Sequence, residues 1–189
     1  NLPLAFFPDI YNEDWFFFAR EAASRELPRV GRAIQAEYDP YASTDRARRE
    51  EFGDLLAEGL FALLGQADPS VLFRDQVRAA NAAYWSRFID ARHEVIAETA
   101  ALLRVALDRI GDNGRGSAAL TSLAASQDQL DHMITADDCV NFVDAWQSDL
   151  DDWQRFSSRI NNVGSSRGAM HFLQLDTWTH AEFGDPAVE

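Results

Sequence analysis

The stretch that decides the fold is 69-PSVLFRDQVRAANAAYWSRFIDARHEVIAETAALLRVALDRI-110, which contains no glycine and no proline after its first residue. Apolar residues recur along it at spacings of three, four or seven, which is the period of a helix face. The first stripe comprises Val77, Ala80, Tyr84, Phe88, Ala91, Val95, Leu102 and Ala106, and a second stripe adds Trp85, Ile89, Ile96, Leu103 and Leu107. The pattern predicts a single helix of about 42 residues, about 60 Å long at a rise of 1.5 Å per residue.

A helix of that length has a consequence for a chain of 189 residues. A compact globule of this size is too small to bury the whole apolar stripe of such a helix. The helix is therefore expected either to be kinked or to pack its projecting part on another chain.

Caps and breakers on both sides of this stretch predict further helices. Glycine-rich loops are expected at 111–116 and 161–168. N-caps are expected at Asn12, at Ser43 or Thr44, and at Thr135, with Asp138 completing a capping box. The sequence thus predicts an all-α protein, a bundle of about five or six helices around one helix of about 40 residues.

The N-terminus is unusually aromatic. Pro3 and Pro8 prevent a regular helix before Asn12, so residues 1–11 are expected to form an extended apolar arm. The arm would precede a single helical domain, 12–183, and a short tail, 184–189. Seven aromatic residues lie in the first 18 positions: Phe6, Phe7, Tyr11, Trp15, Phe16, Phe17 and Phe18. Three consecutive phenylalanines do not fit on one side of a helix, so we expect part of this segment to dock on an apolar surface.

Charge and composition exclude several classes of protein. The formal net charge of −14 disfavours binding to nucleic acid or to an anionic membrane. All 17 basic residues are arginines, so lysine Schiff-base chemistry is excluded. The single cysteine, Cys139, excludes an intramolecular disulfide and a multi-cysteine metal site. No apolar run approaches the roughly 20 residues that span a bilayer, so we expect no transmembrane segment and a cytoplasmic location.

One pattern suggests a metal site. His93, Glu94 and Glu98 share the long helix, while Asp128 and His132 stand four residues apart on another helix. Bundle di-metal sites use such carboxylate and histidine ligands. The usual Glu-x-x-His motif is missing, however, and a chain with 31 acids places an acid near most histidines by chance. Solvated helix faces are the competing interpretation, no cofactor is favoured, and no catalytic residue is assigned.

The favoured function is a non-catalytic helical interaction or scaffold protein, either a homo-oligomer or an accessory subunit of a larger assembly. Its partner would be another protein or a second copy, and a phasin-like coat on an apolar inclusion is one form of that role. The expected interface residues are Phe6, Phe7, Tyr11, Trp15, Phe16, Phe17, Phe18, Tyr84, Trp85 and Phe88. Two alternatives stay open: a metal-dependent oxidase using the ligands above, and a regulatory domain with a ligand cavity lined by Tyr84, Trp85, Phe88 and Trp146.

Overall fold

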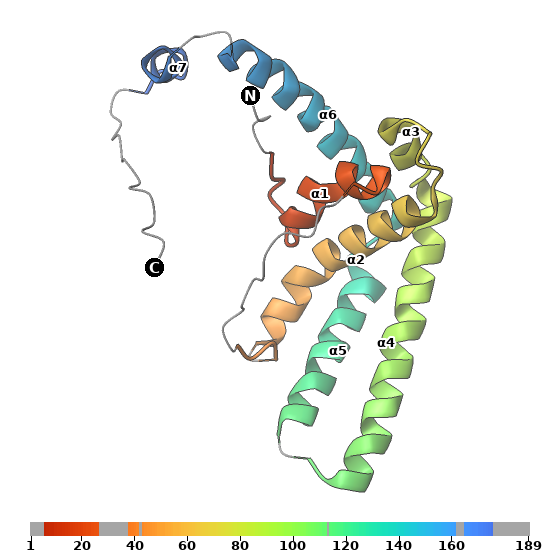
Figure 1. Ribbon diagram of the computed structural model, residues 1–189. Helices are drawn as coiled ribbons and strands as arrows, with labels where there is room; N and C mark the ends of the chain where they lie inside the picture. The colour runs from red at the N-terminus through yellow and green to blue at the C-terminus, as the bar shows by residue number, and fades with distance from the viewer. Residues whose placement is uncertain (1–5, 27–37, 42, 113, 162–164, 176–189) are drawn as a thin grey trace, which may run out of the picture. The chain divides into compact units, whose positions relative to one another are not determined.

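The computed structural model describes residues 6–26, 38–41, 43–112, 114–161 and 165–175 (Figure 1). Every regular element in these ranges is an α-helix, which confirms the predicted all-α class. Seven helices are present there, rather than the five or six expected. They are α1 (Glu13–Ser24), α2 (Thr44–Gln66), α3 (Phe73–Arg78), α4 (Ala82–Ile110), α5 (Arg115–His132), α6 (Ala136–Asn161) and α7 (Ser166–Phe172).

The chain divides into two compact units. One comprises Ala5–Ser148, and the other comprises Asn1–Leu4 with Asp149–Glu189, so the boundary falls within α6. The core of the larger unit centres on α2, which packs against α1, α3, α4 and α5. The largest fully buried side chains are Trp85, Leu55, Leu56, Leu60, Leu64, Glu51, Val77 and Cys139. All but Glu51 are apolar or weakly polar, so burial of apolar surface holds these helices together.

Local caps form as the sequence predicts at two helix starts. The hydroxyl of Ser43 accepts a hydrogen bond from the backbone N–H of Arg46 at 3.4 Å, which caps α2. Before α6, the carboxylate of Asp138 accepts from the backbone N–H of Thr135 at 2.9 Å. The backbone N–H of Asp138 donates in return to the hydroxyl of Thr135 at 3.2 Å. The capping box predicted at this position is therefore confirmed, with Asp in place of the usual Glu.

The predicted helix of about 40 residues is wrong, because the stretch breaks into α3 and α4 at Ala79–Asn81. Asn81 has an extended backbone (φ −81°, ψ 176°), and its side-chain oxygen accepts from the backbone N–H of Tyr84 at 3.0 Å. An asparagine side chain can satisfy a free N–H in this way, so it starts a helix more readily than it continues one. The long helix that results, α4, has 29 residues.

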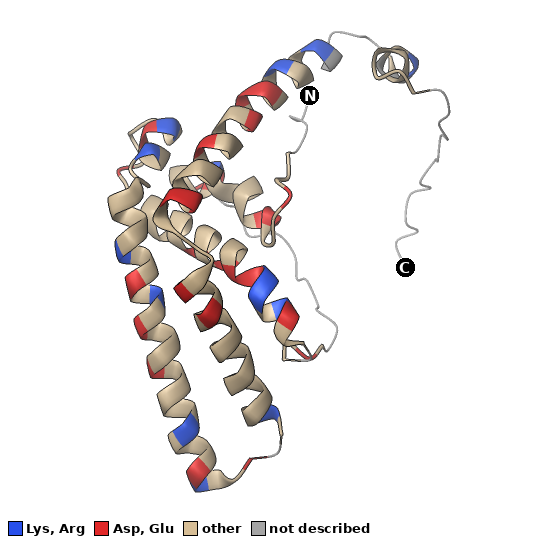
Figure 2. Ribbon diagram, turned by 180° about the vertical axis from the view of Figure 1, so that it is seen from behind, with Lys and Arg blue, Asp and Glu red and all other residues tan. Residues whose placement is uncertain are grey.

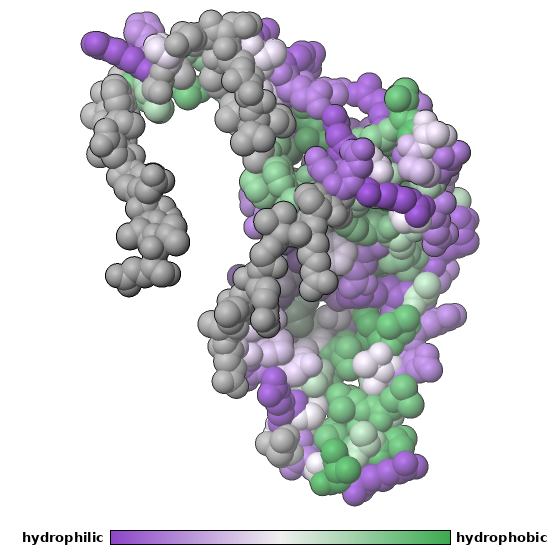
Figure 3. Space-filling model, in the orientation of Figure 1, coloured by the Kyte–Doolittle hydropathy of each residue, from purple (hydrophilic) through white to green (hydrophobic). Residues whose placement is uncertain are grey.

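The two apolar stripes of α4 differ in how far they are buried. The second stripe forms the core, since Trp85, Ile89 and Ile96 are 0%, 9% and 6% exposed. In the first stripe Val95 is 57% exposed and Leu102 is 64% exposed. An apolar region is visible over the lower part of α4 in the space-filling view (Figure 3). Part of the apolar surface of this helix is thus not covered by the unit to which it belongs.

Helices α4 and α5 form an antiparallel hairpin. Gly111 and Gly114 adopt positive φ angles of 77° and 86° in the connection between them. The side chain of Leu107 lies against Gly116, where an added Cβ would come within 2.3 Å of it. The last turns of α4 lie beyond the end of α2 (Figure 1), and of residues 101–110 all but Leu103 and Leu107 are exposed.

The smaller unit contains the end of α6 and the short helix α7. Phe156 lies between Trp153 and Phe172, with ring centroids 5.5 Å and 6.1 Å away. The terminal parts of the predicted domain division, residues 1–5 of the arm and the tail 184–189, lie outside the described residues. Residues 6–12 contain no helix, and the extended conformation of the arm stays a prediction.

Candidate functional site

The most distinctive surface of the larger unit is a continuous group of aromatic side chains on and beside α1. We call Phe7, Trp15, Phe17, Phe18 and Phe61 the α1 aromatic surface. Phe7 stacks on Phe17 with ring centroids 5.0 Å apart, and Phe17 meets Phe18 edge-on at 4.7 Å. Trp15 meets Phe61 of α2 at 4.9 Å. The rings support one another while remaining open to solvent, since Phe7 is 51% exposed and Phe18 is 42% exposed.

Helix geometry explains why this surface is exposed. Phe16 points into the core at 3% exposure and meets Phe142 and Trp146 edge-on, at 5.4 Å and 5.3 Å. Successive residues of a helix are rotated by about 100°, so Phe17 and Phe18 are turned away from that core. Two of the three consecutive phenylalanines therefore remain on the outside, in line with the expectation from sequence.

An apolar hollow opens within this surface. It has a volume of about 230 Å³ and is lined by Asp14, Trp15, Phe18 and Phe61. Asp14 and Glu13 form the acidic first turn of α1, and both are exposed. The arginine of α1 and the arginine that follows the helix are engaged elsewhere: Arg20 lies over the ring of Phe73, and Arg25 donates to the carbonyl oxygen of Gly65 at 3.2 Å. The hollow thus combines an apolar floor with a carboxylate at its edge.

A charge cluster joins α2 to α4. Arg92 of α4 donates from Nε to Oε1 of Glu51 at 2.9 Å and from Nη1 to Oε2 of Glu58 at 2.6 Å. The side chain of Arg92 is 16% exposed and that of Glu51 is 2% exposed. A carboxylate this deeply buried requires such a partner, because an unpaired charge in a protein interior is costly. The cluster positions α4 on α2.

The same face of α2 anchors the start of α1 through Asp54. The side-chain amide of Asn12 donates to Oδ1 of Asp54 at 2.6 Å, and the expected side-chain cap by Asn12 is not made. Burial raises the pKa of Asp54 to about 6, against the lowering effects of the Asn12 hydrogen bond and the charge of Arg92. Beside it, the backbone of Tyr11 packs directly on Gly53, where an added Cβ would lie 2.3 Å from the Tyr11 carbonyl oxygen.

The residues predicted as metal ligands are not brought together. His93 Nδ1 contacts the side chain of Gln127 and lies 3.5 Å from Oδ1 of Asp131. His132 is 71% exposed at its side chain and lies 3.8 Å from Asp128. Glu94 and Glu98 are exposed on α4. Within the described ranges, no group of three or more His, Cys, Asp or Glu side chains is arranged to hold a metal ion.

Two of the ten predicted interface residues belong to the core instead. Phe16 is 3% exposed and Trp85 is 0% exposed. The hydroxyl of Tyr84 donates to the carbonyl oxygen of Gly59 at 2.5 Å, and burial raises its pKa to about 12. Packing is tight here, because a Cβ added to Gly59 would lie 2.3 Å from Trp85.

The ligand cavity expected among Tyr84, Trp85, Phe88 and Trp146 is not supported by their contacts. The first three side chains pack on one another, with Trp85 and Phe88 both against the backbone of α2 at Gly59. Trp146, which is 2% exposed, is packed instead against Phe16 and Phe73.

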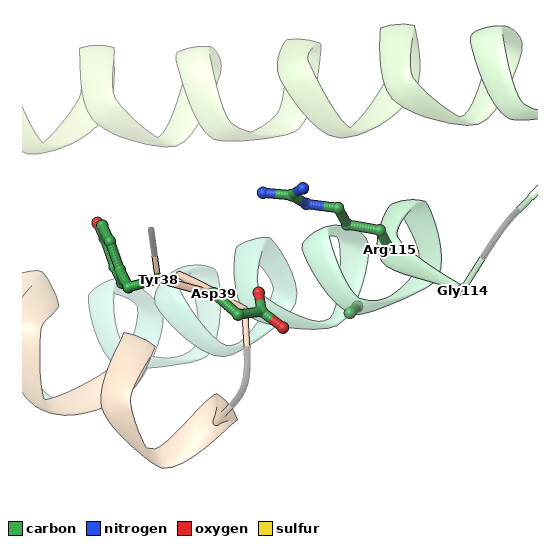
Figure 4. Close-up of a pocket in the computed structure, with 5 residues that line it drawn as sticks. Tyr38, Asp39, Gly114 and Arg115 are labelled. Atoms are coloured by element: carbon green, nitrogen blue, oxygen red, sulfur yellow. The ribbon is translucent and has the colours of Figure 1, made fainter. Parts of the chain in front are cut away.

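A larger hollow lies where the segment before α2 passes the start of α5 (Figure 4). It has a volume of about 520 Å³ and is lined by Tyr38, Asp39, Gly114, Arg115 and Ala118. Four of these five residues are exposed. The hollow is therefore a surface depression, and its open walls do not exclude water from a bound molecule.

The thiol of Cys139 is shielded from solvent. The residue is completely buried at the start of α6, and burial together with the charge of Asp138 raises the pKa of its thiol to about 12. The thiolate, which is the reactive form, is therefore scarcely populated at neutral pH.

Sequence reasoning missed Phe61 as a surface residue and the cluster of Arg92 with Glu51 and Glu58. Phe61 falls in the apolar stripe of α2, and nothing local marks it as less buried than its neighbours. The ion pair joins residues 41 positions apart, so no short-range spacing reveals it.

No described helix is long and apolar enough to cross a membrane. Comparison with protein-family models, curated proteins and solved structures finds no match.

Proposed function

We propose that the protein is a non-catalytic helical interaction protein that binds a protein partner through the α1 aromatic surface. The observation that carries this proposal is the exposure of aromatic side chains that pack against one another. Large aromatic side chains contribute most of the binding energy in protein interfaces. Contiguous exposed groups of such side chains are uncommon on protein surfaces and usually mark interaction sites. The Asn12–Asp54 hydrogen bond and the packing of the Tyr11 backbone on Gly53 support the same role, because they fix the start of α1 on α2.

The charges around the surface define the chemistry of the partner. Glu13 and Asp14 are exposed beside the hollow, and the nearby Arg20 and Arg25 are engaged elsewhere. The chain as a whole carries a formal net charge of −14. The complementary partner is a protein segment with apolar anchors flanked by arginine or lysine. Its anchors would occupy the hollow at Trp15, Phe18 and Phe61.

Two synthetic peptides test this proposal. Both are amphipathic helices with the same leucine and phenylalanine face, but one has an arginine polar face and the other a glutamate polar face. We expect isothermal titration calorimetry to detect binding of the arginine peptide and to detect much weaker binding of the glutamate peptide. In the variant Trp15→Ala/Phe18→Ala, the affinity for the arginine peptide should fall at least about tenfold.

The matched control is Leu72→Ala, which removes an apolar side chain that is 74% exposed and lies outside the α1 aromatic surface. Neither variant changes the net charge, so both keep any unspecific attraction for a basic peptide. Circular dichroism establishes that each variant retains its helix content. Equal binding of the arginine peptide by the wild type and by Trp15→Ala/Phe18→Ala would contradict the proposal.

A further inference from the structure

The side of α4 that faces away from α5 carries apolar residues without a partner in the described structure. We call Ala91, Val95, Glu98, Leu102, Val105 and Arg109 the outer face of α4. Its three large apolar side chains, Val95, Leu102 and Val105, are 57%, 64% and 49% exposed. The opposite side of the helix is the covered one: Ile96 and Ala100 line the groove between α4 and α5, and Leu107 packs on Gly116.

The spacing along the outer face alternates between four and three residues from Ala91 to Arg109. This is the heptad spacing that keeps a line of residues on one side of a helix when a second helix packs along it. The line covers about 27 Å at 1.5 Å per residue. Residues Ala101 and Ala106 beside it are exposed and small, so they allow close approach of another helix.

Two charged residues interrupt this apolar line, and they select the direction of the partner helix. Glu98 and Arg109 are both exposed, and neither has an ion-pair partner among the described residues. Charges of both signs are distributed along α4 in the view from behind (Figure 2). If two copies of α4 packed in parallel, Glu98 would face Glu98 and Arg109 would face Arg109. Like charges placed opposite each other are unfavourable, so the parallel arrangement is disfavoured.

An antiparallel arrangement pairs every one of the central positions favourably. With the twofold axis between positions 103 and 104, Leu102 faces Val105 of the second copy, and Glu98 faces Arg109 of the second copy. Because the axis is twofold, each of these contacts occurs twice. The antiparallel register displaced by one heptad places Val95 opposite Val105, but it also places Leu102 opposite Glu98 and Ala91 opposite Arg109, which buries charges against apolar side chains.

We infer that a second copy of this chain packs antiparallel on the outer face of α4, with Leu102 against Val105 at the centre and Glu98 paired with Arg109 on both sides. This inference deepens the proposed interaction function, because it names a second copy as one partner. It uses a surface separate from the α1 aromatic surface. In this register Val95 lies opposite Asp112, beyond the end of α4, so only Leu102 and Val105 of each chain meet apolar partners. The dimer is therefore a weak one that forms at high protein concentration.

Charge reversal in the full-length chain tests the arrangement. Sedimentation equilibrium over a concentration series up to about 0.5 mM measures the dimer dissociation constant. Glu98→Arg and Arg109→Glu should each weaken the dimer at least about tenfold, because each creates two repulsive contacts across the twofold axis. The double variant Glu98→Arg/Arg109→Glu restores opposite charges and should recover the dissociation constant to within about threefold of the wild-type value.

Asp90→Arg is the matched control, since it makes the same charge change at an exposed position of α4 outside the outer face. It should leave the dimer intact, whereas Leu102→Gln should weaken it. A wild-type chain that stays monomeric throughout the series overturns the inference. So does a dimer that resists both single reversals. A dimer lost only in Trp15→Ala/Phe18→Ala would also overturn it, but would leave the proposed role of the α1 aromatic surface standing.

Discussion

Arg92 of α4 and Glu51 of α2 form a buried ion pair, with Nε of the guanidinium 2.9 Å from Oε1 of the carboxylate. The second guanidinium contact, from Nη2 to Oε2 of Glu51, is 3.4 Å long. Glu51 is buried among the leucines of α2, and Glu58 binds the same guanidinium from the exposed side. The pair therefore fixes the position of α4 on α2, and with it the direction in which the outer face of α4 points.

Removal of the arginine should be strongly destabilising. Arg92→Met leaves the carboxylate of Glu51 buried without its partner, and the expected loss in the free energy of unfolding is about 3 kcal/mol. Urea denaturation monitored by circular dichroism measures this loss. The double variant Arg92→Met/Glu51→Met removes both charges and should recover most of the stability, because apolar side chains of similar volume replace the pair. A double variant that is no more stable than Arg92→Met would show that Glu51 is not the cause.

Asp54 makes the stability of the chain depend on pH. Burial raises the pKa of this carboxyl in the folded chain to about 6, above its ordinary value of 3.8. The folded chain therefore holds the proton more tightly than the unfolded chain does. The free energy of unfolding thus falls as the pH rises between these two values, and it stays at the lower level above about pH 6.

The variant Asp54→Asn removes that ionisation while keeping an oxygen that accepts from the amide of Asn12. At pH 7.5 it should be more stable than the wild type by about 1 kcal/mol, a discounted figure because the group is only partly buried. The gain should vanish below pH 3.8, where the wild-type carboxyl is protonated in both states. Urea denaturation at the two pH values measures the difference. An equal gain at both values would assign the effect to packing rather than to the proton.

The glycines of α2 provide a matched pair for testing how closely α1 approaches. Gly53→Ala places a Cβ 2.3 Å from the carbonyl oxygen of Tyr11, whereas Gly65 has no such neighbour within 4 Å. Alanine is favoured over glycine in a helix interior by roughly 0.5–1 kcal/mol. Gly65→Ala should therefore raise the melting temperature, and Gly53→Ala should lower it despite the same local gain. Two variants that both raise it would mean that Tyr11 moves aside at little cost.

The all-α class follows from the sequence because helix periodicity and caps are local signals. The pattern from Pro69 to Ile110 does not reveal the break at Asn81. The local sequence does not distinguish an asparagine inside a helix from one that caps a helix, because tertiary packing decides between the two. Both apolar stripes of α4 also satisfy the helix period. Only the positions of α2 and α5 determine that Trp85 and Ile96 are covered while Val95 and Leu102 are not.

The α1 aromatic surface is also predicted only in part, because composition is a local signal and burial is not. Seven aromatic residues in the first 18 are a compositional signal, and Phe7, Phe17 and Phe18 do lie on the surface. Which of the consecutive phenylalanines faces inward depends on Phe142 and Trp146, which lie more than a hundred residues away in the chain. The spacing of Asp128 and His132 predicted their proximity on one helix face, but spacing alone does not determine whether His93 joins them.

The most direct test of an interaction protein, as opposed to a metal enzyme, is native mass spectrometry of the purified chain before and after treatment with a chelator. The spectra report subunit number and bound mass together. We expect the bare mass of the chain, a dimer fraction that grows with protein concentration, and no change on chelation. A monomer that carries one or two metal ions, and loses them to the chelator, would contradict the account and direct attention to His93 and His132.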